Sequence, residues 1–397
     1  MAPNATSLAP SGSGAGRGTP ANSVPGSSTS AVIGVQYLRG VAALMVAYFH
    51  LAGQHPTYTA FFKQHLMGFD TLSSGVDVFF VISGFIILVS SRNLRPGGFL
   101  LRRLMRIAPL YWILTLVAAA TALLAPSLFR TTVVSPEYLL KSLLFIPYAN
   151  PGQHGDLVPL IVPGWSLNFE MFFYLLFAVL LLWPLRLRLA ISGAVFLVLL
   201  AAAAGLHSLG RWRELAFFGD FKLFEFWMGM IIAQLYLGRR VHLPWWSCVA
   251  ITVLGFAALV LGVPLGLLPA GSWQEAVFLH IVPSALIVFG AVAAEQSRPM
   301  PRLPFLLLLG DASYSLYLTH IFSLGVARAL WSKFGLEAVT AAHVLSFAVF
   351  SMAVVILAAI AVYRWVEQPM LERLHRLLKR PGRTPVSLAA AGKADAG

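Results

Sequence analysis

Apolar residues dominate the chain from Val32 to Val362, in stretches separated by short breaks rich in Pro, Gly and Arg. A helix needs about 20 apolar residues to cross a bilayer, and the stretches approach this length. The pattern therefore predicts an all-α, polytopic membrane helix bundle of about ten transmembrane helices. The predicted spans are 32–52, 72–91, 107–126, 163–183, 189–207, 215–237, 246–267, 277–295, 305–328 and 341–363.

The two ends of the chain differ from this apolar region. The first thirty residues are rich in Ser, Gly, Ala and Pro, with Arg17 as their one charge and no apolar run. They lack the pattern of a signal peptide, and we expect a disordered tail over 1–31. A transmembrane domain is predicted over 32–371 and a basic cytoplasmic tail over 372–397, with no internal repeat and no second domain.

The composition argues against a soluble enzyme. Of the 397 residues, 58% are hydrophobic and 11% are charged, against roughly 25% charged residues in a soluble domain. The net charge of +13 is interpreted as loop Arg and Lys that orient the protein and contact anionic lipids, not as a nucleic-acid surface. The single cysteine, Cys248, excludes an intramolecular disulfide and a cysteine-based metal cluster, and no metal is expected.

The distribution of basic residues predicts the orientation. If the N-terminus is cytoplasmic, 19 of the 28 Lys and Arg residues fall on the cytoplasmic side and 7 on the outer side. Cytoplasmic loops of membrane proteins carry the excess of basic residues. Both termini are therefore predicted to be cytoplasmic.

Two polar residues in the first predicted span lie on one helical stripe. Arg39 and His50 are eleven residues apart, which returns to within roughly 20° of the same face, about 16 Å along the helix. A histidine at this depth can take a hydroxyl proton and return it. The alternative is an interfacial histidine that is hydrogen-bonded by water.

Further charges fall inside later predicted spans. Asp77, near the outer end of the second span, can orient or pair with His50, or can instead satisfy free backbone N–H groups at a helix start. Lys222 and Glu225, three residues apart, are expected to neutralise each other.

A basic patch precedes the third span. It contains Arg102, Arg103 and Arg106, of which the last two share a helical face and present two guanidinium forks suited to phosphate oxygens. A phosphorylated cytosolic donor can dock there. Ordinary positive-inside topology is the alternative explanation.

The fourth predicted span begins with a polar pair. Ser166 and Glu170 are four residues apart and point in one direction. A buried acid at this position is expected to pair with Arg39 or His50 or to hold an acceptor sugar, and a structural ion pair is the alternative.

Taken together, these residues resemble the acyltransferase 3 family of integral-membrane acyltransferases, in particular its bacterial exopolysaccharide O-acetyltransferases. The resemblance extends from about Ile33 to Leu371. The motifs that carry it are Tyr37-Leu38-Arg39-Gly40 with His50, Gly75-Val76-Asp77-Val78-Phe79-Phe80, Ser83-Gly84-Phe85, Arg103 and Arg106 before Ile107, Trp165-Ser166-Leu167 with Glu170, the run from Gly310 to His320, and Tyr363 to Pro369 with Glu367.

The resemblance implies an enzyme of the bacterial cytoplasmic membrane. Such an enzyme transfers an acyl group, usually acetyl, from cytosolic acyl-CoA to a hydroxyl of an extracytoplasmic glycan or its lipid-linked precursor. It also implies roles for individual residues: His50, Arg39, Glu170 and Asp77 as catalytic-site residues, Arg102, Arg103 and Arg106 as donor-binding residues, and Trp165 and Ser166 as substrate-binding residues.

Two other classes of function stay open from the sequence. A transporter or flippase of a glycan or acyl group would also use a basic cytosolic face and buried charges. Inverted repeats would favour a transporter, and we detect none in the sequence. A structural partner in polysaccharide assembly is the third class. The sequence does not identify the acceptor sugar.

Overall fold

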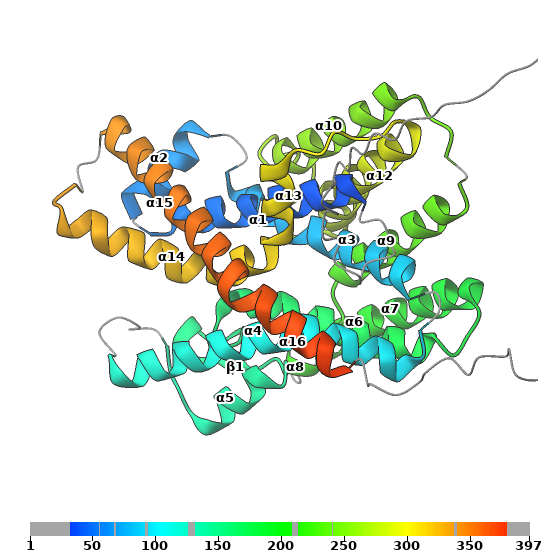
Figure 1. Cartoon of the computed structure of the whole chain (residues 1–397), viewed down its shortest axis with the longest axis horizontal. Helices are drawn as coiled ribbons and strands as arrows, with labels where there is room; N and C mark the ends of the chain where they lie inside the picture. The colour runs from blue at the N-terminus through cyan, green and yellow to red at the C-terminus, as the bar shows by residue number, and fades with distance from the viewer. Residues whose placement is uncertain are drawn as a thin grey trace, which may run out of the picture. The chain divides into compact units, whose positions relative to one another are not determined.

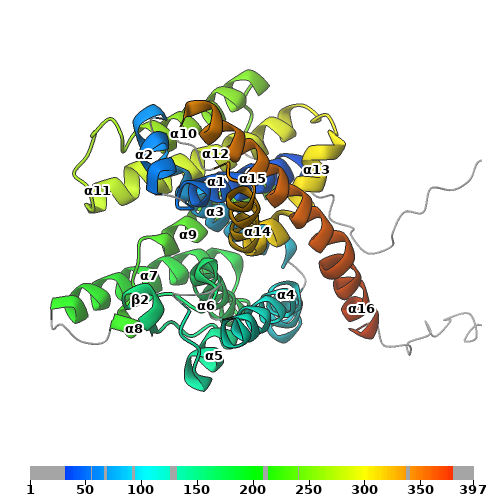
Figure 2. The ribbon, with the colours of Figure 1, turned by 90° about the vertical axis from the view of Figure 1, so that its left-hand side faces the viewer.

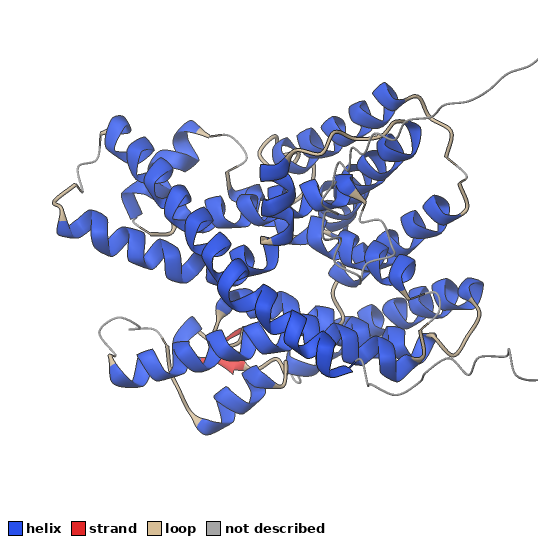
Figure 3. Cartoon of the chain, viewed as in Figure 1, coloured by secondary structure: helices blue, strands red, loops and turns tan. Residues whose placement is uncertain are grey.

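The protein is an assembly of helices. The computed structural model describes residues 32–54, 56–66, 69–91, 94–125, 132–208, 213–239, 241–336 and 340–378. The tail predicted over 1–31 and the last part of the tail predicted over 372–397 lie outside these residues. Within them, the strands are a short antiparallel pair, β1 (Ala149–Asn150) and β2 (Asp156–Leu157), and nearly everything else is helical (Figures 1 and 3). The all-α prediction is confirmed.

The longer helices follow one another along the chain with short connections. The α-helices are α1 (Ile33–Ala52), α2 (Pro56–His65), α3 (Gly75–Ser90), α4 (Pro96–Leu124), α5 (Pro136–Leu143), α6 (Trp165–Leu180), α7 (Leu185–Ser208), α8 (Arg213–Ala216), α9 (Lys222–Leu237), α10 (Trp245–Leu261), α11 (Trp273–Glu275), α12 (Val282–Ser297), α13 (Pro304–Asp311), α14 (Ser313–Lys333), α15 (Ala341–Val362) and α16 (Gln368–Leu378). Tighter or wider turns join them: η1 (Asp70–Ser74), η2 (Pro151–Gln153), η3 (Val162–Gly164), η4 (Ala276–Ile281) and η5 (Tyr363–Glu367).

Each predicted span overlaps a helix, but fewer helices have the length for a full crossing. In the described part of the chain, seven helical stretches are long and apolar enough to span a membrane, or eight if one bent pair counts as a span. The predicted spans 215–237 and 246–267 correspond to α9 and α10, which have 16 and 17 residues. At about 1.5 Å per residue these are shorter than the roughly 30 Å hydrocarbon core. The protein is a multi-pass membrane protein, and ten crossings remain a prediction.

Two helices differ from their predicted spans in shape. The predicted span 305–328 is broken, because α13 and α14 meet at an angle of 74°. The predicted span 107–126 is the second part of α4, which begins with Pro96 in its first turn, where the missing N–H costs nothing. As a result the basic patch lies on the membrane helix itself, not in a loop before it.

The helices around the site form two groups that lie side by side. In Figures 1 and 2, α4 to α7 lie on one side, and α1, α3, α12 and α14 lie on the other. α9 packs against both α3 and α7. Aromatic rings fill the core where the groups meet: the Phe226 ring centroid lies 4.7 Å from that of Phe80 and 4.5 Å from that of Phe173.

Helices α3 and α9 cross at two glycines. A Cβ added to Gly84 would lie 2.0 Å from the Phe226 carbonyl oxygen, and one added to Gly229 would lie 2.0 Å from the Val81 carbonyl oxygen. Small residues let the backbones of membrane helices approach closely. This crossing fixes which face of α3 meets α9, and with it the partners of the polar residues on α3.

Candidate functional site

A cavity of about 260 Å³ lies between five helices, α1, α3, α4, α6 and α14. Its charged and hydroxyl-bearing lining residues are Arg39, Ser83, Arg103, Arg106, Ser166, Glu170, Tyr174, Ser313, Tyr314 and Tyr317. Apolar side chains from α3, α4 and α6 complete the wall. Five of the predicted site residues, Arg39, Arg103, Arg106, Ser166 and Glu170, meet here, although they come from three separate helices.

Three guanidinium groups line the cavity, and each has a different environment. Arg39 donates to Gln36 Oε1 at 3.2 Å. Arg103 donates to Ser90 Oγ. The Arg103 guanidinium carbon also lies 5.6 Å and 5.7 Å from the ring centroids of Phe99 and Tyr174.

Arg106 is paired with a carboxylate from the C-terminal part of the chain. Its Nη1 contacts Glu367 Oε1, and its guanidinium carbon lies 5.2 Å from the Tyr314 ring centroid. The second Glu367 oxygen accepts a hydrogen bond from Ser315. Arg103 and Arg106 share a face as their spacing predicted. Arg102 is exposed and does not line the cavity.

Glu170 enters the cavity from α6 without an ion pair in the described part of the chain. Its Oε1 accepts hydrogen bonds from Ser83 Oγ at 3.0 Å and from the Tyr174 hydroxyl. The expectation that Glu170 pairs with Arg39 or His50 is therefore not met by any direct contact in the described residues. Three arginines and one carboxylate line the cavity, and this excess of positive charge suits it to an anionic ligand.

Ser166 and Tyr317 meet at the cavity wall. Their hydroxyl oxygens are 2.8 Å apart, and both donate to the Pro163 carbonyl oxygen, at 3.1 Å and 2.9 Å. Trp165 does not line the cavity; the centroid of its ring lies 5.7 Å from Lys222 Nζ. Of the two predicted substrate-binding residues, Ser166 therefore lines the cavity and Trp165 does not.

His50 lies in the last turn of α1, beyond the lining of the cavity. It is half-buried, and its Nδ1 donates to the Val46 carbonyl oxygen at 2.9 Å. Its ring centroid lies 5.0 Å from that of His320, and the His320 ring lies 6.0 Å from that of Tyr317. His50 thus connects to the cavity through two residues of α14, while Arg39 lines the cavity directly.

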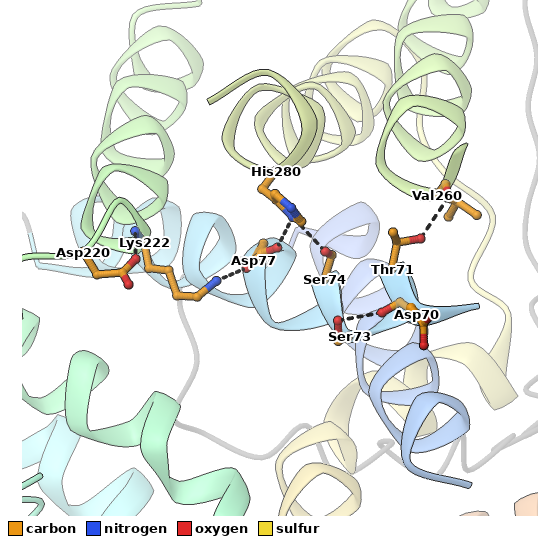
Figure 4. Close-up of polar contacts among 9 residues, drawn as sticks. All are labelled: Asp70, Thr71, Ser73, Ser74, Asp77, Asp220, Lys222, Val260 and His280. Carbon is orange, nitrogen blue, oxygen red and sulfur yellow. Dashed lines mark hydrogen bonds and ion pairs between the residues drawn. The ribbon is translucent and has the colours of Figure 1, made fainter. Parts of the chain in front are cut away.

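Asp77 does not reach His50. Its Oδ1 lies 2.8 Å from Lys222 Nζ and its Oδ2 lies 3.1 Å from His280 Nδ1, which is also 3.0 Å from Ser74 Oγ (Figure 4). The suggested Asp77–His50 pair is therefore wrong, because Asp77 faces α9 and η4. The predicted Lys222–Glu225 ion pair is also wrong, because the ion pair of Lys222 is formed with Asp77.

Several lining residues were not singled out from the sequence. Tyr314 and Tyr317 were noted only within the motif from Gly310 to His320. Tyr174 was given no role, although it follows Glu170 by four residues and so shares its helical face. Glu367 was noted only as part of a motif, and its pairing with Arg106 spans 261 positions, which no local spacing indicates. Among the described residues, no group of three or more His, Cys, Asp or Glu side chains is arranged to hold a metal ion.

Comparisons with known proteins show what the chain is similar to. Residues 32–364 match a protein-family model described as an acyltransferase domain. The exopolysaccharide production protein ExoZ of Rhizobium meliloti (strain 1021) is 37% identical over 313 residues, which cover 76% of this chain and 90% of that protein. No solved structure matches the chain.

Proposed function

The chain belongs to the acyltransferase 3 family, and from this premise we propose that it transfers an acetyl group from cytosolic acetyl-CoA to a hydroxyl of an extracytoplasmic glycan. The observation that carries the proposal is the cavity within the helix bundle, which is lined by Arg39, Arg103 and Arg106. His320, one turn of α14 beyond the lining residue Tyr317, forms a pair with His50 next to this cavity. The acceptor is proposed to be an exopolysaccharide or its lipid-linked precursor, because the relative is named for exopolysaccharide production.

The charges of the cavity support an acyl-CoA donor. CoA carries phosphate groups, and guanidinium forks bind phosphate oxygens through two parallel hydrogen bonds. Arg103 lines the cavity next to Arg106, whose charge is already shared with Glu367. We propose that Arg103 is the stronger phosphate ligand, and that the pantetheine arm extends past Ser83 and Tyr317 toward the histidines.

The depths of the residues along α1 support a transfer across the membrane. Arg39 lies near the start of α1 and His50 in its last turn, about 16 Å further along the axis. In the proposed orientation, with both termini cytoplasmic in a bacterial cytoplasmic membrane, the donor cavity opens toward the cytosol. His50 then lies toward the outer side, where the glycan arrives.

His50 is proposed to act as the general base. Its Nε2 takes the proton of the acceptor hydroxyl, and the alkoxide oxygen bonds to the thioester carbon. Arg39 or nearby dipoles stabilise the resulting oxyanion, a contribution worth about 2.7–4 kcal/mol for one donor in a serine protease. The carbon–sulfur bond then breaks, and the CoA sulfur leaves with the proton. In a two-step alternative, His50 itself carries the acyl group.

The test uses purified full-length protein, labelled acetyl-CoA and a glycan acceptor. We expect CoA release that depends on the acceptor, labelled glycan as the product, and loss of both in His50→Ala protein that still inserts and binds CoA. Transfer by the His50→Ala protein at near wild-type rate would refute the base role. Movement of the glycan across vesicles without acetyl-CoA turnover would favour the transporter, and an acyl-His50 adduct formed with acetyl-CoA alone would favour the two-step route.

A further inference from the structure

Two histidine rings from different helices face each other beside the cavity. His50 is in the last turn of α1 and His320 is in α14, with ring centroids 5.0 Å apart and ring planes at 53°. His320 is fully buried, whereas His50 is half-buried. Two rings joined by an N–H···N hydrogen bond of about 3 Å have centroids roughly 5 Å apart. The centroid distance of the two rings therefore matches that of a hydrogen-bonded pair, although no hydrogen bond joins them in this structure.

Backbone hydrogen bonds set where each ring carries its hydrogen. His50 Nδ1 lies 2.9 Å from the Val46 carbonyl oxygen, and His320 Nδ1 lies 2.6 Å from the Tyr317 carbonyl oxygen. A carbonyl oxygen only accepts, so each Nδ1 must donate and each neutral ring keeps a lone pair on Nε2. Within the described part of the chain, His320 Nε2 has no hydrogen-bond partner. A buried acceptor without a partner is rare and calls for an explanation.

The surroundings of the pair contain no competing charge. Among the described residues, neither ring has a carboxylate, lysine or arginine within ion-pair distance. Two other buried carboxylates form ion pairs elsewhere, Asp77 with Lys222 and Glu367 with Arg106. In many acyl-transfer enzymes a carboxylate stabilises the imidazolium that forms during the reaction. The Nδ1 that such a carboxylate would contact donates here to the Val46 carbonyl oxygen, and a second imidazole, that of His320, lies beside the His50 ring.

We propose that His320 is a positioning residue that holds, with His50, the proton taken from the acceptor. The inference rests on the base role proposed for His50. Once the alkoxide oxygen has bonded to the acyl carbon, the N–H left on His50 Nε2 donates to His320 Nε2. When the carbon–sulfur bond breaks, the proton passes from His50 to the departing sulfur, and both rings return to their neutral forms. No oxidant or further reactant is needed.

The experiment compares His320→Gln and His320→Leu with wild-type full-length protein in the acetyl-transfer assay. A glutamine keeps a hydrogen-bond donor for the Tyr317 carbonyl but cannot accept a proton. We expect kcat to fall about 10- to 100-fold in both variants, less than the roughly 10²- to 10⁴-fold that a general base contributes, because His50 itself is kept. The KM for acetyl-CoA should stay within about twofold, because binding is untouched. Ser323→Ala, which removes a buried hydroxyl three residues further along α14, is the matched control and should retain the wild-type kcat.

The outcomes separate this inference from the proposed function. If His50→Ala is inactive while His320→Gln keeps kcat within about twofold of wild type, the proton-sharing role is wrong and the function stands. If His50→Ala stays active, both fail. Where His320→Gln does not fold, ¹⁵N NMR of histidine-labelled wild-type and His50→Gln protein decides. A buried ring with its hydrogen on Nδ1 and an Nε2 signal that shifts in His50→Gln supports the proposal, and a hydrogen on Nε2 of that ring refutes it.

Discussion

The guanidinium of Arg106 forms an ion pair with the carboxylate of Glu367, and this pair ties α4 to η5, 261 positions away in sequence. The Glu367 side chain is 1% exposed and the Arg106 side chain is 31% exposed. The pair therefore holds the C-terminal helix against the cavity while it offsets one of the three arginine charges. The contribution of this ion pair to the stability of the protein can be measured without an acetyl-transfer assay.

Glu367→Ala should destabilise the protein strongly. The change leaves Arg106 without its counterion and Ser315 without its acceptor, and breaking one side of a buried pair costs about 3–5 kcal/mol. The reaction of a thiol-specific dye with Cys248, the single and buried cysteine, reports unfolding in detergent during a thermal ramp. Glu372→Ala removes an exposed carboxylate on α16 and should change stability by less than about 0.5 kcal/mol. Equal thermal midpoints for the two variants would contradict the buried pair.

Neighbouring arginines on α4 should differ in their effect on donor binding. Arg103 lines the cavity, while Arg102 is exposed outside it. A hydrogen bond to a charged group contributes about 1.5–3 kcal/mol, so Arg103→Ala should weaken CoA binding about 10- to 100-fold. Arg102→Ala should leave the affinity within about twofold. Calorimetric titration of purified protein with CoA measures both. An equal loss in the two variants would mean that the patch acts through its overall charge, and no loss in either would remove the cavity as the donor site.

The sequence predicted the features that depend on local spacing. Helix positions followed from the length of apolar stretches, because a helix and its burial in lipid are decided within about 20 residues. The shared face of Arg103 and Arg106 followed from their separation of three, and the different depths of Arg39 and His50 followed from their separation of eleven. The meeting of α1, α4 and α6 around one cavity had no local signal; the family resemblance supplied that expectation.

The features that depend on helix neighbours were not predicted correctly. Asp77 was expected near His50 because both lie toward the outer side, but the Gly84 and Gly229 crossing turns α3 toward α9 and brings Lys222 to Asp77. The bend of 74° between α13 and α14 comes just after Gly310, where the sequence has no proline. The apolar pattern runs through the bend without a break, and a single straight span was therefore predicted. Depth alone does not say which side chains touch.

Lys222→Met should lower the stability of the protein, because it removes the lysine that is paired with the buried Asp77 carboxylate. Asp77 is 3% exposed, and removing its lysine leaves a buried carboxylate beside His280 without the lysine charge, a loss of about 3–5 kcal/mol. The matched control is Lys63→Ala, because the Lys63–Asp70 pair at 3.2 Å is more than half exposed on both sides and should contribute about 0–1 kcal/mol. The Cys248 dye assay measures both. If Asp77→Asn added to Lys222→Met recovers none of the loss, the two charges do not interact as the structure shows.

The glycine crossing should be the least tolerant contact between α3 and α9. In Gly229→Ala the new methyl group would lie 2.0 Å from the Val81 carbonyl oxygen, and backbone atoms cannot move aside as a flexible side chain can. Separating the helices costs about 1–3 kcal/mol as overpacking, and it also moves Lys222 away from Asp77, so Cys248 should become reactive at lower temperature. Gly325→Ala is the control, since a Cβ there meets no atom within 4 Å, and its thermal midpoint should match wild type. A Gly229→Ala protein as stable as the Gly325→Ala protein would show that α3 and α9 leave room for a methyl group at Gly229, so that the 2.0 Å contact with the Val81 carbonyl oxygen does not exist. The Asp77–Lys222 contact would then need another explanation.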